Sequence, residues 1–413
     1  MPQRDIDAIV AGHVCLDIIP RFPGAKVPLE EVFKPGRLIN VKEATLSTGG
    51  AVSNTGIPLA KLGVKTTLMA RIGSDEFGQL TRARLARSAS VEGIVESPGA
   101  HSSYTLVIAP PGIDRIFFHS PGANDAFGPE DVNATLCARA RLFHFGYPPL
   151  MRRMHADGGR ELVEVFRKAK GAGATTSLDM ALPDPSSEAG RLDWRPLLKR
   201  LMLHVDIFQP SAEEALYMAD RDAYRRLKAK AGGGDIVELM NGEEHSALAA
   251  QFIQWGAAIV TLKSGHRGFY ARTAAQERFE KMGAARPGDP ARPGDSARPG
   301  EADAWANREI WAPALRPPEG GSATGAGDCS LAGFLAAFLR GETLEGAVAC
   351  AIAVAWQNLH ALDAVSGVRD WPETQRIATD RSLPQIPFTL PSPPWRFDYE
   401  QRLWRGSYAP IAA

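Results

Sequence analysis

The sequence predicts an α/β protein with a mostly parallel sheet, helices on both faces of that sheet, and a small β-sheet lid. Short apolar runs alternate with amphipathic stretches over most of the 413 residues. Most of these runs are β-branched or continuously apolar, which is typical of strands buried on both faces of a parallel sheet. The amphipathic stretches between them supply the helical crossovers that parallel pairing requires.

The predicted elements follow one another in a regular order. The predicted strands are 6–12, 66–72, 142–146, 175–179, 205–208 and 257–262, and the predicted helices are 54–62, 77–88, 160–169, 194–203 and 247–255. We therefore expect the main α/β domain to comprise residues 1–12, 49–100 and 123–413.

Two segments, 13–48 and 101–122, carry β-type residues without intervening helices. Within the second segment, Pro110-Pro111-Gly112 separates two apolar runs, which predicts a hairpin. We expect both segments to form the lid, a small sheet that stands off the main one. The alternative is that they are loops and edge strands of the main sheet. We also expect the lid to be the contact surface of a homodimer.

Residues 285–302 form a near-repeat with a six-residue step, ARPGDP, ARPGDS and ARPGEA. Pro and Gly in every step disfavour helix and strand, so we expect a disordered insertion over about residues 283–303. The chain after Trp371 is rich in proline and contains Trp395 and Trp404. We expect this tail to wrap the surface of the main domain.

Charge and composition disfavour several classes of protein. The 47 Lys and Arg residues balance 47 Asp and Glu residues, whereas a nucleic-acid binder usually has a basic excess. The longest apolar stretches, 331–339 and 346–356, are shorter than the ~20 residues of a membrane span. The N-terminus does not read as a signal peptide, and the four cysteines lack metal-binding spacing. We expect a cytoplasmic protein with reduced thiols and neither nucleic-acid nor membrane partners.

The stretch GSATGAGDC at 321–329 carries the strongest chemical signal, because an apolar run typical of a buried helix follows it. Backbone N–H groups at the start of that helix would bind an anion, and Asp328 lies beside them in the first turn. An anion site next to a base suits transfer of a phosphoryl group to an alcohol. The structural alternatives are a helix cap and a tight turn. A dinucleotide-binding fingerprint fails because Ser330 replaces its third glycine, and a P-loop fails because no Lys-Ser/Thr follows.

This stretch resembles the C-terminal signature DTTGAGD of the ribokinase-like (PfkB) carbohydrate kinase family, and TGAGD is retained at Thr324–Asp328. The N-terminal signature is matched by GGAVSNT at 49–55 and PLAKLG at 58–63. Further similarity lies at Asp17, GSDEFG (73–78), GAN (122–124), the stretch 206–214 and KSGHRG (263–268). The resemblance spans about residues 7–367, with the insertion as an interruption.

The resemblance implies an ATP-dependent kinase that phosphorylates a hydroxyl of a small uncharged sugar with the help of Mg²⁺. The implied catalytic groups are the base Asp328 and the anion hole of Gly325, Ala326 and Gly327. The implied sugar-binding residues are Asp17, Gly49, Gly50 and Asn54. The implied nucleotide-binding residues are Lys263, Gly265, Gly268 and Thr324, and Glu214 would order magnesium through water. The structural alternatives are a turn cap for Asp17 and a helix N-cap for Asn54.

Three positions depart from the family pattern. Ser211 replaces the Asn of the family's NxxE motif, which implies different or more water-dependent positioning of magnesium and phosphate. Ser322 replaces the Asp that belongs to the monovalent-cation site of potassium-activated members, so we do not expect activation by K⁺. The family's DPN-like stretch reads Asp179-Met180-Ala181 and lacks its Asn.

Two other functions stay open at this point. A nucleoside kinase of the same fold is one, since Tyr104, Phe117 or Phe118 would be able to stack on a base. A sugar-binding regulatory protein that has lost turnover is the other, although the intact Asp328 argues against it. An uncharged sugar is preferred to a sugar phosphate because residues 49–54 include no Lys or Arg, while Arg115 on the hairpin offers another place for such a contact.

Overall fold

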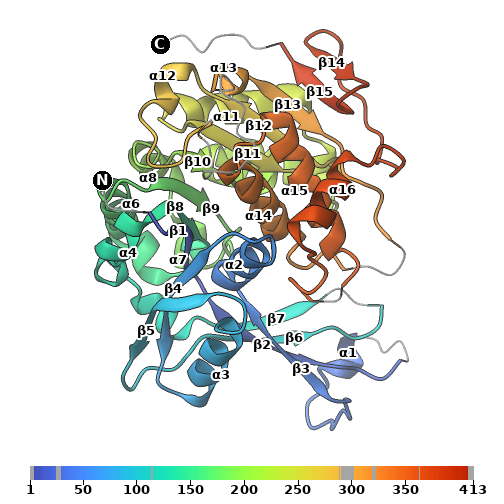
Figure 1. Ribbon diagram of the computed structural model, residues 1–413. Helices are drawn as coiled ribbons and strands as arrows, with labels where there is room; N and C mark the ends of the chain where they lie inside the picture. Colours follow the sequence, from blue (N-terminus) through green and yellow to red (C-terminus); the bar gives the residue numbers. More distant parts are fainter. Residues whose placement is uncertain are drawn as a thin grey trace.

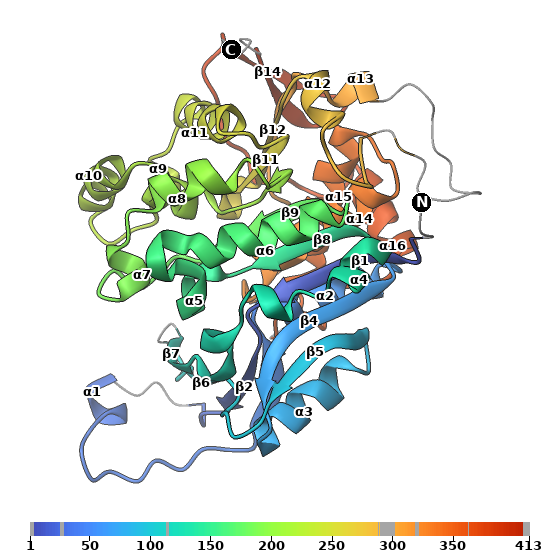
Figure 2. The same cartoon turned by 90° about the vertical axis from the view of Figure 1, so that its left-hand side faces the viewer.

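The computed structural model describes residues 4–24, 29–112, 115–287, 289, 302–318, 322–361 and 363–407. Its main sheet has eleven strands (Figures 1 and 2). Their spatial order is β14 (Trp395–Asp398), β15 (Leu403–Gly406), β13 (Glu309–Ala312), β12 (Phe269–Thr273), β11 (Ile259–Lys263), β10 (Ile207–Phe208), β9 (Thr175–Asp179), β8 (Ala140–Gly146), β1 (Ile6–Gly12), β4 (Thr66–Gly73) and β5 (Ser90–Ser97).

The predicted mostly parallel sheet is confirmed. From β5 through β4, β1, β8, β9 and β10 to β11, every neighbouring pair is parallel, and the pairs beyond β11 are antiparallel. All six predicted strands are present, with β10 shortened to two residues and β11 starting two residues late.

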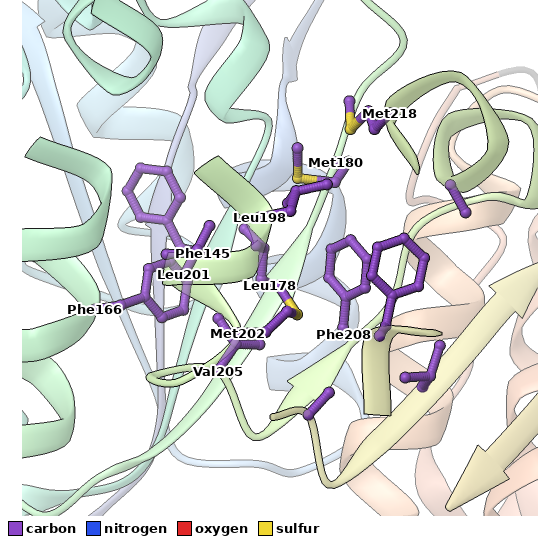
Figure 3. Close-up of a cluster of buried hydrophobic side chains, with 14 of the residues drawn as sticks. Phe145, Phe166, Leu178, Met180, Leu198, Leu201, Met202, Val205, Phe208 and Met218 are labelled. Atoms are coloured by element: carbon purple, nitrogen blue, oxygen red, sulfur yellow. The ribbon is translucent and has the colours of Figure 1, made fainter. Parts of the chain in front are cut away.

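Alternate residues of β1 enter two different hydrophobic cores, as expected for a strand buried on both faces. Ile9 and Ala11 belong to one core, which packs against α6 (Arg160–Gly171), α8 (Trp194–Leu201), α9 (Ala212–Ala219) and α11 (Gly242–Gln254). Figure 3 shows part of this core, including Phe145 of β8, Phe166 of α6 and Phe208 of β10. Ala8 and Val10 belong to the other core, with α2 (Ala51–Lys61), α14 (Ala326–Leu339), α15 (Leu344–Asn358) and α16 (Trp371–Thr379).

The five predicted helices are also present, as α2, α3 (Glu76–Leu85), α6, α8 and α11. Two predicted helices begin earlier than their apolar pattern, α2 after Gly50 and α11 after its N-cap Asn241, whose side chain accepts from the Glu244 N–H at 3.0 Å. The helices not yet given are α1 (Leu29–Val32), α4 (Ala134–Arg139), α5 (Arg152–His155), α7 (Glu188–Arg191), α10 (Arg221–Ala231), α12 (Gln276–Phe279) and α13 (Ala302–Trp305). In the part of the chain that the structure describes, no helix is both long and apolar enough to cross a bilayer.

A second sheet contains four strands in the order β3 (Ala44–Gly49), β2 (Cys15–Pro20), β6 (Tyr104–Ile108) and β7 (Ile116–Ser120). It lies at the lower end of the molecule in Figure 1, apart from the main sheet. The predicted hairpin is confirmed, because β6 and β7 pair antiparallel from Tyr104 opposite Ser120 to Ile108 opposite Ile116. The alternative, edge strands of the main sheet, does not apply to these strands. The function of this sheet as a lid stays a prediction, as do the domain boundaries.

The tail differs from the expectation that it only wraps the surface. Strands β14 and β15 instead extend the main sheet next to β13, and Trp395 is buried with its ring 6.3 Å from that of Trp311. Ala285, which was expected in the insertion, is instead buried, and its N–H donates to Thr175 Oγ1 of β9 at 2.9 Å. Most of the ARPGD repeat, at 288 and 290–301, lies outside the described residues.

Candidate active site

The carboxyl ends of the parallel strands meet at one edge of the main sheet. Gly12 of β1 lies opposite Gly146 of β8, and Gly146 lies opposite Asp179 of β9. A further bridge joins Ser211, which follows β10, to Lys263 at the end of β11. Ligands of open α/β sheets bind at this edge.

The glycine-rich stretch forms the start of the buried helix α14, as the sequence predicts. Gly325 is the N-cap residue, and its left-handed φ of 72° favours glycine. A Cβ at Gly325 would also lie 2.5 Å from the carbonyl oxygen of Ala364, so the position leaves no room for a side chain. Gly325, Gly327 and Asp328 line a cavity of about 390 Å³ together with Tyr147 and Glu214.

Asp328 is 5% exposed, and two neutral donors hold its carboxylate. The hydroxyl of Tyr147 donates to both carboxylate oxygens at 2.7 Å, and Asn54 Nδ2 donates to Oδ2 at 3.4 Å. Burial raises the pKa of Asp328, while Lys263, Tyr147 and Asn54 act in the opposite direction. Sequence reasoning missed Tyr147, which is 181 positions from Asp328 in the chain.

Lys263 was expected to border the nucleotide, and the structure places its ammonium among carboxylates. It forms an ion pair with Asp179, and its Nζ lies 3.9 Å from Glu214 Oε2. Burial acts to lower the pKa of Lys263, but Asp179, Glu214 and Asp328 outweigh it and raise that pKa. The second oxygen of Asp179 is buried and has no hydrogen-bond partner among the described residues.

Glu214 and Ser211 cap the start of α9 reciprocally. Ser211 Oγ accepts from the Glu214 N–H at 3.1 Å, and Glu214 Oε2 accepts from the Ser211 N–H at 2.7 Å. Serine is as good an N-cap as asparagine, so the missing Asn of the NxxE motif does not displace Glu214. Burial raises the pKa of Glu214.

The carboxylates of this cavity fit a divalent cation that is bound only in part by protein. Among the residues that the structure describes, no group of three His, Cys, Asp or Glu side chains could hold a metal ion by itself. Mg²⁺ commonly takes one or two carboxylates and fills its remaining positions with water and phosphate oxygens. Glu214, which lines the cavity, is a donor of that kind. Asp179 does not line the cavity, because it is fully buried and paired with Lys263.

Asp17 lies on β2 against Gly49 of β3. A Cβ at Gly49 would lie 2.3 Å from Asp17 Oδ2, so only glycine permits this approach. The thiol of Cys15 donates to Asp17 Oδ1 at 3.3 Å, and burial raises the pKa of Asp17. Asp17 is within a strand and so does not cap a turn. Gly50, not Asn54, is the N-cap of α2, so the side chain of Asn54 is available to Asp328.

A line of hydrogen bonds joins Asp17 to two histidines that sequence reasoning missed. Thr105 Oγ1 donates to Cys15 Sγ at 3.5 Å and lies 3.0 Å from His119 Nδ1 on β7. His119 Nε2 lies 3.2 Å from His13 Nε2, and the ring of His13 is 6.2 Å from that of Tyr147. Burial lowers the pKa of His13 to about 3, so this ring is neutral at physiological pH. The small sheet is thereby connected to the edge that holds Asp328.

A second cavity of about 350 Å³ adjoins the first, because Lys263, Gly265 and Gly327 line both. Its other walls are mostly apolar and include Leu315, Ala323, Ala326, Trp356 and Leu359. The expected nucleotide residues Gly265 and Gly268 belong to these walls. Thr324 is engaged elsewhere: its hydroxyl lies 2.9 Å from Ser322 Oγ, and its carbonyl accepts from Asn358 Nδ2 at 2.7 Å.

Solved structures share this architecture over nearly the whole chain. The fructokinase with bound ATP from Xylella fastidiosa aligns with a TM-score of 0.64 and 20% identity, covering 91% of this chain and 99% of that one. The Arabidopsis thaliana ribokinase complexed with ribose and ATP aligns with a TM-score of 0.63 and 17% identity, with the same coverage. The Methanocaldococcus jannaschii nucleoside kinase gives a TM-score of 0.57 and 17% identity over 90% and 98% of the two chains. The protein therefore has the ribokinase-like α/β fold.

The family follows from the sequence itself. The profile of the pfkB family of carbohydrate kinases matches residues 9–369, and the chain belongs to this family. Among curated relatives, the fructokinase of Solanum tuberosum is 31% identical over 183 residues, which are 43% of this chain and 53% of the relative. The probable fructokinase-4 of Arabidopsis thaliana is 26% identical over 214 residues, 51% and 61% of the two chains. The chain thus spans about half the length of the curated relatives it matches.

Proposed function

We propose that the protein is an ATP-dependent kinase that transfers the γ-phosphoryl group to a hydroxyl of a small uncharged sugar. The observation that carries this proposal is the buried Asp328, held by Tyr147 and Asn54 in the first turn of a glycine-capped helix. Membership of the pfkB family and the printed names of the relatives, fructokinase and ribokinase, support it.

The two cavities supply separate places for the two substrates. The apolar cavity beside Gly265, Gly268 and Trp356 suits the flat, apolar faces of adenine. From there the phosphates would pass Gly327 into the cavity of Asp328, where backbone N–H groups at the start of α14 would face them. Of the three expected anion-hole residues, Ala326 already donates its N–H to the Ala323 carbonyl at 3.2 Å. The sugar would bind on the other side, with its hydroxyls donating to Asp17 and hydrogen-bonding to Asn54, whose Oδ1 is buried and unpartnered among the described residues.

The reaction then needs one base and stabilisation of developing charge. Asp328 would accept the proton of the sugar hydroxyl as the new O–P bond forms and the bond between the β,γ-bridging oxygen and the γ-phosphorus breaks, leaving ADP. The N–H groups of the turn would stabilise the transferred group. Lys263 would keep its proton and offset the charge of the surrounding carboxylates. Glu214 would hold Mg²⁺ through water, and the ion would supply neutralisation of charge on the phosphates.

A nucleoside acceptor is the second candidate. Phe117 and Phe118 of β7 are 56% and 49% exposed, and exposed aromatic faces on the small sheet are suited to stacking on a base. Tyr104 is less free to stack, because its ring packs against Phe77 at 5.5 Å.

An ADP-release assay over pentoses, hexoses, sugar phosphates and nucleosides tests the proposal, with ³¹P NMR to identify the product. We expect one uncharged sugar to have the highest kcat/KM, with Asp328→Asn as the inactive control. A preference for nucleosides would favour the second candidate. Sugar binding by calorimetry without any ADP release would favour the regulatory protein that has lost turnover.

A further inference from the structure

The ammonium group of Lys61 lies among backbone carbonyl oxygens of the loop that follows α15. Lys61 is the last residue of α2, and its Nζ donates to the carbonyls of Val365 at 2.8 Å, Ser366 at 3.3 Å and Val368 at 3.4 Å. An ammonium has three donors, and three backbone oxygens surround this one. Such a set of neutral oxygens around one positive charge is also what a free monovalent cation would require.

The same loop packs on the turn that precedes Asp328. The carbonyl oxygen of Ala364 lies 2.5 Å from the position of a Cβ on Gly325, and it accepts from the thiol of Cys329 at 3.3 Å. At the other end of the loop, the carbonyl of Leu359 accepts from the Ser322 N–H at 3.2 Å. The position of residues 363–368 therefore limits where the Gly325–Asp328 turn can lie.

The charges around Lys61 are those of a partly buried cation site. Burial lowers the pKa of Lys61 and the positive charge of Arg369 acts in the same direction, whereas Asp363 and Cys329 act to raise it. The carboxylate of Asp363 accepts from the N–H groups of Val365 and Ser366 at 3.0 and 2.6 Å, which fixes the backbone that carries the carbonyls. Ser322, at the edge of the same turn, adds only a neutral hydroxyl.

We propose that Lys61 is a built-in monovalent cation that positions the phosphate-binding turn. Its ammonium would hold residues 365–368 in the conformation that presses Ala364 against Gly325, so the protein would need no free potassium ion for this purpose. Helix α2 would then act on Asp328 from two sides, through Asn54 near its start and through Lys61 at its end. The link to phosphate binding rests on the proposed function, whereas the carbonyl site itself does not.

The test compares Lys61→Met, which keeps an unbranched side chain, removes the charge and leaves the position of Nζ open to a free cation, with Lys65→Met. Lys65 has an exposed side chain four residues further along and serves as the matched control. Each protein is studied in potassium, ammonium and tetramethylammonium chloride at equal ionic strength. The readouts are the thermal midpoint without ligand, the Kd for ATP without acceptor, and kcat where a substrate is known.

For Lys61→Met we expect a midpoint about 2 °C or more lower, and an ATP affinity at least about threefold weaker, in tetramethylammonium than in ammonium or potassium. The wild-type protein and Lys65→Met should show no such difference. Equal values for Lys61→Met in all three salts would overturn the proposal, as would a wild-type protein that itself requires potassium. Absence of turnover with every acceptor would count against the proposed kinase function alone, since the first two readouts need no acceptor.

Discussion

The hydroxyl of Tyr147 donates to both carboxylate oxygens of Asp328 at 2.7 Å, from a residue whose own backbone is left-handed with φ of 65°. Such a conformation is unfavourable for a bulky residue and persists only where its surroundings impose it. Each carboxylate oxygen has two lone pairs, so a substrate hydroxyl can still bind beside the tyrosine. Tyr147 therefore fixes the orientation of Asp328 and favours its ionised form.

Replacing Tyr147 by Phe should reduce the fraction of Asp328 that is ionised at a given pH, while the carboxylate itself remains. The pKa of Asp328, already raised by burial, should rise further because a hydrogen bond that lowers it is lost. Since the base must be ionised, the acid limb of kcat/KM should move to higher pH by about 1 unit, with a drop in kcat of about tenfold. The pH–rate profile checks this. An acid limb at the wild-type position would show that the tyrosine does not influence the base.

Replacing Asp328 by Asn removes the proton acceptor but little volume. We expect kcat to fall by ~10²–10⁴, with the affinities for ATP and sugar changed by no more than a few-fold. Steady-state kinetics combined with calorimetric binding separate the two effects. Near-normal turnover in this variant would contradict the assignment of Asp328 as the base.

Asp17→Asn should weaken sugar binding without lowering the stability of the folded protein. Burial raises the pKa of Asp17, so its ionised form destabilises the folded protein above that pKa, and the penalty disappears below the unfolded value of about 3.9. The variant should therefore melt at or above the wild-type temperature at pH 7–8, and this difference should shrink as the pH falls toward 4. The KM for sugar should rise while that for ATP stays nearly constant. An unchanged sugar KM would remove Asp17 from the binding site.

Ser211 offers a matched pair of variants. Ser211→Asn retains an N-cap and should leave stability and turnover close to wild type, whereas Ser211→Ala should cost about 1 kcal/mol of stability. Urea unfolding measures the stability of both variants. If Ser211→Asn raised kcat strongly, the amide of the family motif would have a role beyond capping, and our reading of this position would be wrong.

The expected homodimer through the small sheet remains a prediction. Phe33, Phe117 and Phe118 are each about half exposed, and the ring of Phe33 lies 6.1 Å from that of Phe118. Exposed apolar groups that cluster in this way often mark a contact surface. Sedimentation velocity should show a dimer for the wild-type protein and a monomer for Phe117→Glu. A wild-type monomer at micromolar concentration would refute the prediction.

Local patterns were sufficient for the sheet and for Asp328, because apolar periodicity and the TGAGD turn depend on neighbouring residues. They were not sufficient for Tyr147, His13 or His119, whose proximity depends on β1 lying beside β8 and on the hairpin folding back. The ion pair between Lys263 and Asp179 was not predicted either, because the two residues are 84 positions apart in the chain. The burial of Trp395 near the end of the chain was also not predicted, because it depends on the pairing of β15 with β13.

The reciprocal cap formed by Ser211 and Glu214 bears on how related chains are recognised. In this chain the first position of that motif supplies a helix cap, a property that Ser, Thr, Asp and Asn share. A search pattern that insists on Asn-x-x-Glu would pass over chains such as this one. A pattern written for any capping residue followed three positions later by Glu would retain them. It would count the replacement of Asn by Ser as conservative and not as loss of the motif.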